Sequence, residues 1–254
     1  WSGDQVAEAY QEATRKLVRD FSTREVAPGA AERDRTGQFD YALYSRLGEL
    51  GITGMRFPEE LGGTGADFLS WCLALEEIGR VDMSLAVTLF VTVSTAHELV
   101  EMGTHQQLQA WREPFILPVA QGRATASAAI TEPGAGSDTA GIQTTGVLQD
   151  GQWLINGSKA FITNAGLENN LYTVVVALTD RAAREFSNIL VPAGTPGFSL
   201  MPAYHKMGWR SSDTRELVFE DCRVPASNLL GVEGQGVYQI MGNFQWERLS
   251  LALG

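Results

Sequence analysis

Residues 146–163 read GVLQDGQWLINGSKAFIT, and this stretch decides the fold class of the 254-residue chain. Asp150-Gly151 and Asn156-Gly157 each separate two apolar runs. Both dipeptides tolerate the positive φ angles of two-residue hairpin turns, so the stretch predicts three antiparallel strands in succession. Further strands are predicted at residues 171–178, 187–192 and 216–224. We therefore expect a small β-domain over residues 123–232.

The preceding residues, 1–122, have the spacing of helices. A helix that starts near Ser84 is apolar on all sides, which predicts that it is buried all round. Thr104 followed by Gln107 predicts a capping box for the next helix, and Pro114 should limit that helix. In the first helix a single apolar face is expected, formed by Val6, Tyr10, Ala13, Leu17 and Phe21.

The last residues, 233–254, predict one more helix, and the sequence stops inside it. Its apolar stripe comprises Val237, Ile240, Met241, Phe244, Leu251 and Ala252. Glu247 falls on this stripe, and a carboxylate among apolar neighbours is the least expected residue in the sequence.

The composition excludes several classes of protein. With 30 acidic and 19 basic residues the net charge is −11, which disfavours a nucleic-acid-binding surface. The apolar run nearest to a membrane helix, residues 83–96, is shorter than the ~20 residues that a span needs. Cys72 and Cys222 lie far apart, so neither a metal site nor a disulfide framework is expected. No signal peptide is visible, and we expect a cytoplasmic protein.

Two segments could contact a ligand. Small residues in residues 130–138, ITEPGAGSD, would let a ligand approach the backbone closely. The same sequence is equally consistent with a polar loop that contains a Pro-Gly turn. In residues 159–166, KAFITNAG, the ring of Phe161 beside the hydroxyl of Thr163 suits a flat heteroaromatic ring. Core packing produces the same alternation.

Three roles are open for Glu247. It could be a surface residue near a helix end, or a buried carboxylate paired with Arg248 or another base. It could also be a general base whose pKa is raised by an apolar pocket. For the three histidines, which have no ligand spacing, a structural role is expected.

Four motifs together resemble the acyl-CoA dehydrogenase family: ITEPGAGSD, KAFITNAG, residues 206–231 and residues 236–254. They occur in the family's order and spacing, and residues 57–67, FPEELGGTGAD, fit its N-terminal region. The resemblance implies an α+β fold with an N-terminal all-α domain, a middle antiparallel β-domain and the start of a C-terminal helical bundle. It also implies that most of the C-terminal domain is missing, so we expect a truncated or partly recorded enzyme.

The resemblance implies that FAD is the cofactor, and it assigns residues by position. Flavin contacts are expected from Ala129, Ile130, Thr131, Phe161, Ile162 and Thr163. Phe161 stands where the family usually has Trp. Contacts with the acyl-CoA substrate are expected from Ser137, Tyr238, Gln245, Trp246 and Arg248.

The family resemblance also bears on Glu247. Isovaleryl-CoA and long-chain members are expected to carry the catalytic Glu in an ERL-type motif on this helix, and Glu247 occupies that position. It would remove the pro-R α-proton of an acyl-CoA while the β-hydride passes to flavin N5, which yields the trans-2-enoyl-CoA. An electron-transfer flavoprotein would accept the electrons, and a homotetramer or dimer is expected.

Two alternatives stay open. A flavin-dependent oxidase or monooxygenase could share the fold. A flavin-free, truncated paralogue could instead act as a binding or scaffolding subunit.

Overall fold

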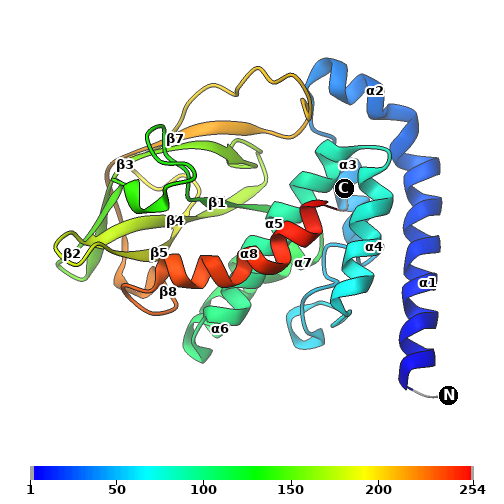
Figure 1. The fold of residues 1–254 in the computed structure, drawn as a ribbon, viewed down its shortest axis with the longest axis horizontal. Helices are drawn as coiled ribbons and strands as arrows, with labels where there is room; N and C mark the ends of the chain where they lie inside the picture. Colours follow the sequence, from blue (N-terminus) through cyan, green and yellow to red (C-terminus); the bar gives the residue numbers. More distant parts are fainter. Residues whose placement is uncertain (1–2, 253–254) are drawn as a thin grey trace.

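The structure, a computed structural model, describes residues 3–252. Helices precede a sheet domain, and one helix follows it (Figure 1). The first helices are α1 (Gly3–Phe21), α2 (Ala27–Thr36), α3 (Tyr41–Glu49), α4 (Phe68–Gly79), α5 (Met83–Met102), α6 (His105–Trp111) and α7 (Leu117–Ala120). The strands are β1 (Thr125–Ala129), β2 (Thr145–Gln149), β3 (Gln152–Thr163), β4 (Asn170–Asp180), β5 (Glu185–Pro192), β6 (Phe198–Leu200), β7 (Thr214–Pro225) and β8 (Leu229–Leu230). Helix α8 (Gly236–Ala252) ends the described chain, and the α+β class is confirmed.

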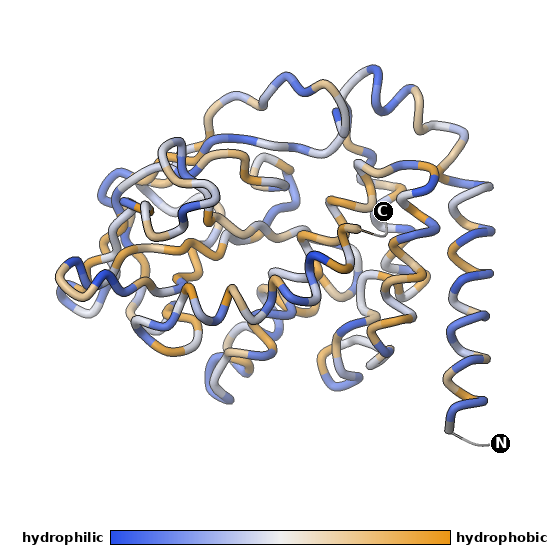
Figure 2. The backbone as a smooth tube through the Cα atoms, in the orientation of Figure 1, coloured by the Kyte–Doolittle hydropathy of each residue, from blue (hydrophilic) through white to orange (hydrophobic). Residues whose placement is uncertain are grey.

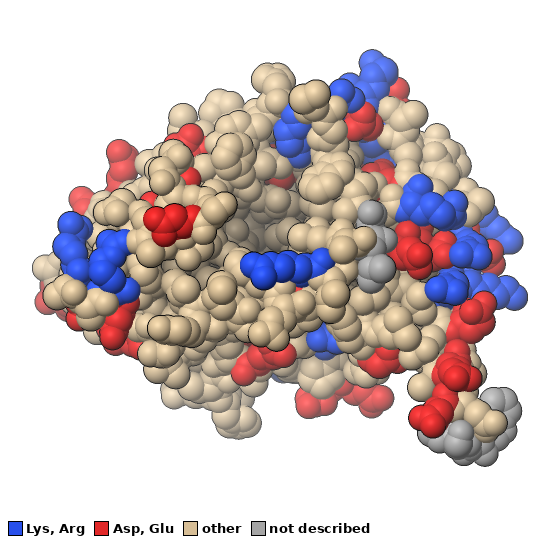
Figure 3. Space-filling model, viewed as in Figure 1, with Lys and Arg blue, Asp and Glu red and all other residues tan. Residues whose placement is uncertain are grey.

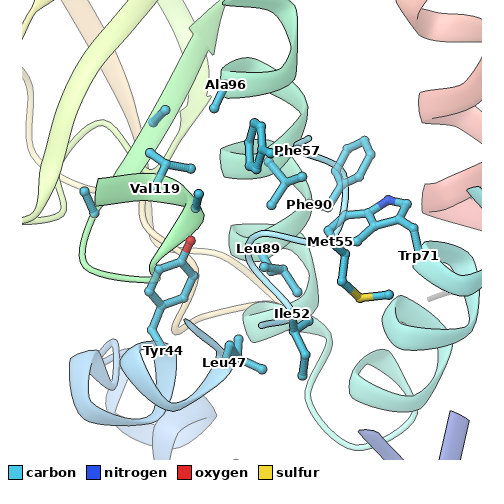
Figure 4. Packing of buried hydrophobic residues seen from close by; sticks show 14 of the residues in the cluster. Tyr44, Leu47, Ile52, Met55, Phe57, Trp71, Leu89, Phe90, Ala96 and Val119 are labelled. Atoms are coloured by element: carbon cyan, nitrogen blue, oxygen red, sulfur yellow. The ribbon is translucent and has the colours of Figure 1, made fainter. Parts of the chain in front are cut away.

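The helical part is built around α5. As its sequence predicts, this helix is covered on all sides, and 83 % of its most apolar 18-residue stretch is buried. Its length and mean hydropathy of 1.5 would also suit a membrane span, but its surroundings are those of a core helix. Large side chains such as Tyr44, Phe57 and Trp71 pack around it with no exposed surface (Figure 4).

The apolar face expected on α1 is largely wrong. Of the predicted residues, Val6, Tyr10, Ala13 and Leu17 are exposed and only Phe21 is buried. The helix contacts α4, and Thr14 and Val18 on a neighbouring face are buried as well. Helix α1 lies at the edge of the molecule with only one side covered, and hydrophilic residues recur along its length (Figure 2). A single partner helix can cover only part of the circumference, so spacing alone misplaced the buried face.

Helix α6 begins and ends where the sequence predicts. Thr104 and Gln107 form the capping box, with Gln107 N donating to Thr104 Oγ1 at 3.2 Å. Helix α6 ends at Trp111, before Pro114, and the chain continues as a π-helical turn over Arg112–Ile116 into α7. A π turn shifts the hydrogen-bond pattern locally, which accommodates a residue without a backbone N–H.

The strands form one sheet in the order β6-β7-β3-β2-β4-β5-β8, and β1 adds to β4 in parallel. Most other pairs are antiparallel, including the β2–β3 hairpin at Asp150-Gly151, where both residues have positive φ. The second predicted hairpin is wrong, because Asn156-Gly157 lies inside β3 and marks a bulge in its pairing with β7. A Cβ at Gly157 would lie 2.5 Å from Thr144 Oγ1, so glycine permits a close approach there rather than a turn.

Helix α8 crosses from the sheet to the helical part. Ile240 packs on the sheet, with Val237 and Phe244 partly buried beside it. Met241 and Leu251 are exposed, so the predicted apolar stripe is only partly correct. The buried side of α8 instead includes two polar residues, Asn243 and Ser250.

Candidate active site

A cavity of about 120 Å³ lies where the sheet, α5 and α8 meet. Helix α5 contributes Phe90, Val91, Ser94 and Thr95, the strands contribute Ala128, Phe161 and Thr163, and α8 contributes Glu247. The face of the molecule above α8 is visibly hollowed (Figure 3). Three segments far apart in the sequence therefore bring an aromatic ring, hydroxyl groups and one carboxylate to the same space.

Glu247 is the one carboxylate that lines this cavity. Its side chain is half-buried, and burial raises its pKa from 4.5 to about 7. Arg248 does not neutralise it, because the Arg248 guanidinium is exposed and lies 5.3 Å from the centre of the Phe244 ring. Since a carboxylate with a pKa near neutrality can both take and release a proton, Glu247 is suited to general base chemistry.

The opposite wall is formed by the end of β3. Phe161 has a φ of +60° and is 66 % exposed, and one face of its ring stacks on Tyr204 at 5.0 Å. The pairing with β7 is irregular between Lys159 and Ile162, which turns Phe161 out of the sheet while Ile162 stays buried. A positive φ at a bulky residue is strained.

Asn164, directly after β3, holds this strained segment in place. Its buried amide nitrogen donates to Thr88 O, Thr92 Oγ1 and Ala126 O, each at 3.1 Å. The end of β3 is thereby tied to α5 and β1, so Thr163 keeps its place in the cavity wall.

The segment after β1 is held against β3 by a buried ion pair, which we call the brace. Lys159 Nζ lies 3.0 Å from Glu132 Oε1 and donates to the carbonyl of Ile130 at 2.9 Å. Glu132 also accepts from the backbone nitrogens of Gln143 and Thr144. Hydrogen bonds from Thr144 and Gln143, together with the charge of Lys159, lower the pKa of Glu132 in spite of its burial. Burial lowers the pKa of Lys159 to about 8.

The brace positions the predicted flavin contacts after β1. Ala129 is fully buried at the end of the strand, and Ile130 is partly buried. The carbonyl of Thr131 accepts from Ala160 N at 2.9 Å, so the two candidate segments run side by side.

The predicted substrate contacts are less closely grouped. Ser137 lies exposed in the loop after β1, and Tyr238, Gln245 and Arg248 are exposed on α8. Trp246 points to the helical part, where its ring contacts His97 at 5.8 Å and lies under the Arg56 guanidinium at 5.5 Å. The cavity thus includes Glu247, Phe161 and Thr163 but none of these five residues.

Sequence reasoning missed Ser94, Glu98 and the brace. Glu98 is a carboxylate in a helix that was expected to be buried all round, which is the same signal that singled out Glu247. Lys159 sits beside Ala160 in a predicted strand, and a charged residue within an apolar run carried the same kind of signal. The partner of each could not be read from spacing.

Comparison with known families matches two models in succession. Residues 8–116 match "Acyl-CoA dehydrogenase, N-terminal domain" and residues 127–222 match "Acyl-CoA dehydrogenase, middle domain". A probable acyl-CoA dehydrogenase of Bacillus subtilis is 38% identical over 244 residues, which cover 95% of this chain and 63% of that protein.

Solved structures agree with these matches. Butyryl-CoA dehydrogenase from Megasphaera elsdenii superposes with a TM-score of 0.89 at 38% identity, covering 96% of this chain and 64% of that one. Glutaryl-CoA dehydrogenase from Mycobacterium smegmatis, in complex with FADH2, superposes with a TM-score of 0.87 at 26% identity. The match covers 100% of this chain and 62% of that one. The chain therefore spans a little under two thirds of the length of these relatives.

Proposed function

This chain belongs to the acyl-CoA dehydrogenase family, and on that premise we propose that it takes part in α,β-dehydrogenation of an acyl-CoA thioester with Glu247 as the base. The observation that carries the proposal is the position of Glu247, half-buried in the cavity that Phe161 and Thr163 also line. Burial brings its pKa to about 7, so its ionised form is populated at neutral pH and still accepts a proton readily.

The residues around the cavity fit FAD. An exposed aromatic ring, Phe161, offers one open face, and the hydroxyl of Thr163 lies half-buried two residues later. Ser94 Oγ is buried and has no hydrogen-bond partner among the described residues, as expected of a group that awaits a ligand. We propose that Ala129–Thr131 and Phe161–Thr163 hold the isoalloxazine, which accepts the β-hydride when bound.

The chain's own residues would divide the remaining work. Glu247 takes the α-proton onto a carboxylate oxygen, and its position on α8 fixes the side from which the proton leaves. The brace and Asn164 keep the two flavin-contacting segments at constant spacing, which is the positioning that such a transfer requires.

A short acyl chain suits the cavity, which has a volume of about 120 Å³ and is lined by the apolar side chains of Phe90 and Val91. We therefore propose a short-chain acyl-CoA as substrate, with the exposed residues Ser137, Gln245 and Arg248 placed to contact the rest of the molecule. An electron-transfer flavoprotein is the proposed electron acceptor, and a homo-oligomer is the proposed assembly.

Glu247→Gln tests the proposal. When butyryl-CoA is added without oxygen to FAD-loaded protein, we expect the wild type to lose its visible flavin absorbance within the mixing time or soon after. The Gln variant should keep both its FAD and its yellow colour, because an amide cannot accept the α-proton.

Glu101→Gln is the matched control, since this half-exposed carboxylate on α5 lies outside the cavity. It should bleach as the wild type does. Bleaching of Glu247→Gln at the wild-type rate would show that another group is the base, and a purified protein without flavin would favour the scaffold alternative.

A further inference from the structure

Several polar side chains lie at the contact between α5 and α8. Helix α5 presents Ser94 and Glu98, one turn apart, and α8 presents Asn243 and Glu247, also one turn apart. Residues four apart share a helix face, so the two pairs meet across the crossing. Ser94, Glu98 and Asn243 are buried, while Glu247 opens to the cavity.

Glu98 lies behind Glu247 as seen from the cavity. It is 5 % exposed and does not line the cavity. Asn243 Nδ2 donates to Glu98 Oε1 at 3.1 Å, which ties this carboxyl to α8 one turn before Glu247. The amide therefore holds the two carboxyl groups at a constant separation.

No cation compensates Glu98 within residues 3–252. The charged and titratable groups that act on it are Glu247 from α8 and Glu101 from its own helix, both negative. From β4, the buried Tyr172 hydroxyl interacts with Glu98 electrostatically and has no hydrogen-bond partner among the described residues. Burial, and then the charge of Glu247, raise the pKa of Glu98 to about 8.

We propose that Glu98 and Glu247 form a carboxyl pair that holds one proton at neutral pH, with Glu98 as a positioning residue that keeps a neutral acid behind the ionised base. The charge of Glu247 acts on Glu98 with no cation to offset it, so ionising both carboxyl groups is costly and the more deeply buried Glu98 keeps its proton. Glu247 alone then exchanges protons with the cavity. The inference rests on the proposed role of Glu247 as the base.

Ionisation of Glu98 would place a second negative charge beside the atoms where the substrate develops its own. The transition state of α-proton removal carries negative charge on the thioester, so this charge should oppose it. Glu98 therefore sets the alkaline limit of the reaction, although it does not touch the substrate.

The infrared absorption of protonated carboxyl groups tests the pair without substrate. Wild-type protein should keep a protonated-carboxyl band at neutral pH, and the band should disappear with a midpoint near the pKa of about 8 that Glu98 has in this site. Glu98→Gln should remove the part of the band that disappears near pH 8, and leave the part from Glu247, which disappears near its own pKa of about 7. This variant retains the carbonyl oxygen that accepts from Asn243, so the helix contact is preserved.

Glu247→Gln provides the coupling measurement. Removal of its charge should move the midpoint of the Glu98 band to lower pH, and Glu101→Gln should move it less, in the order of their effects on Glu98. If the part of the band that disappears near pH 8 survives Glu98→Gln, the proposal is overturned. It is also overturned if Glu247→Gln leaves the midpoint of the Glu98 band unchanged. Neither outcome depends on substrate chemistry, so this test can fail while Glu247 remains the base.

The pH profile of kcat/KM in FAD-loaded enzyme gives the functional readout. With an ionisation near pH 8, wild-type kcat/KM should fall ~10-fold by one unit above that pKa, whereas Glu98→Gln should stay level. A purely structural role for Glu98 would lower the whole profile without changing its shape.

Discussion

Two buried sites of the protein, the brace and the carboxyl pair, place carboxylates in opposite electrostatic surroundings. In the brace, Glu132 has the ammonium of Lys159 at 3.0 Å and two backbone N–H donors. In the carboxyl pair, Glu98 has one neutral amide donor and a second carboxylate nearby. The pKa of Glu132 is lowered, while those of Glu98 and Glu247 are raised.

The difference separates a structural charge from a chemically useful one. Neighbours that stabilise the ionised form of Glu132 keep it charged, and the permanently charged group anchors the segment after β1. Neighbours that destabilise ionisation leave Glu98 and Glu247 close to the protonation change that proton transfer needs. Both carboxylates are buried, so it is the hydrogen-bond donors and the cation around Glu132 that decide between these two outcomes.

The largest expected effect comes from breaking the brace. Lys159→Met should cost about 3–5 kcal/mol in the free energy of unfolding, because it leaves Glu132 buried without its cation. Urea denaturation measures the loss. Lys206→Met is the matched control, since that half-buried lysine donates to Ser212 O and Thr214 Oγ1 without an ion pair. Equal losses in the two variants would mean that burial of the chain, rather than the charge pair, matters at Lys159.

The pH dependence of stability should change in opposite directions when a carboxylate is removed from the carboxyl pair and when one is removed from the brace. A raised pKa means that folded Glu247 holds its proton more tightly than the unfolded chain does, so its contribution is lost as pH rises from about 4.5 to about 7. The free energy of unfolding of Glu247→Gln should therefore rise by on the order of 2 kcal/mol relative to wild type between these two pH values. Above the higher value the difference should stay constant.

Glu132→Gln should show the reverse. Its lowered pKa makes the carboxylate's contribution present above the ordinary value of 4.5 and lost as pH falls below it. The deficit of the Gln variant should shrink in acid. Urea midpoints measured from pH 3.5 to pH 8 compare the two variants, and parallel curves would contradict the distinction between brace and pair.

The smallest effect concerns the amide that joins the pair. Asn243→Leu removes the hydrogen bond to Glu98 and should cost ~1 kcal/mol in unfolding free energy, because the donor and its acceptor are both buried. That hydrogen bond lowers the pKa of Glu98, so its loss should also move the protonated-carboxyl band to higher pH. Ser250→Ala on the same helix face, whose hydroxyl donates to Trp246 O, should leave the band unchanged.

Local features of the fold were predictable from the sequence. The β2–β3 hairpin at Asp150-Gly151 and the capping box at Thr104 depend on residues within a few positions of each other. The order of four motifs identified the family, and the phase of a single helix singled out Glu247. Each of these signals lies within one element or in the order of elements along the chain.

The tertiary structure decided which residues meet. Asn156-Gly157 has the composition of a turn but lies in a continuous strand, because β7 pairs along the whole of β3 and Thr144 packs against the glycine. Val6 and Leu17 follow helical spacing and are exposed, because no second helix within residues 3–252 covers that side of α1. Glu98 and Glu247 are separated by nearly the whole sheet domain in sequence and come together only where α5 and α8 cross. Backbone preferences act over a few residues, whereas the neutralisation of a buried charge depends on elements brought together by the fold.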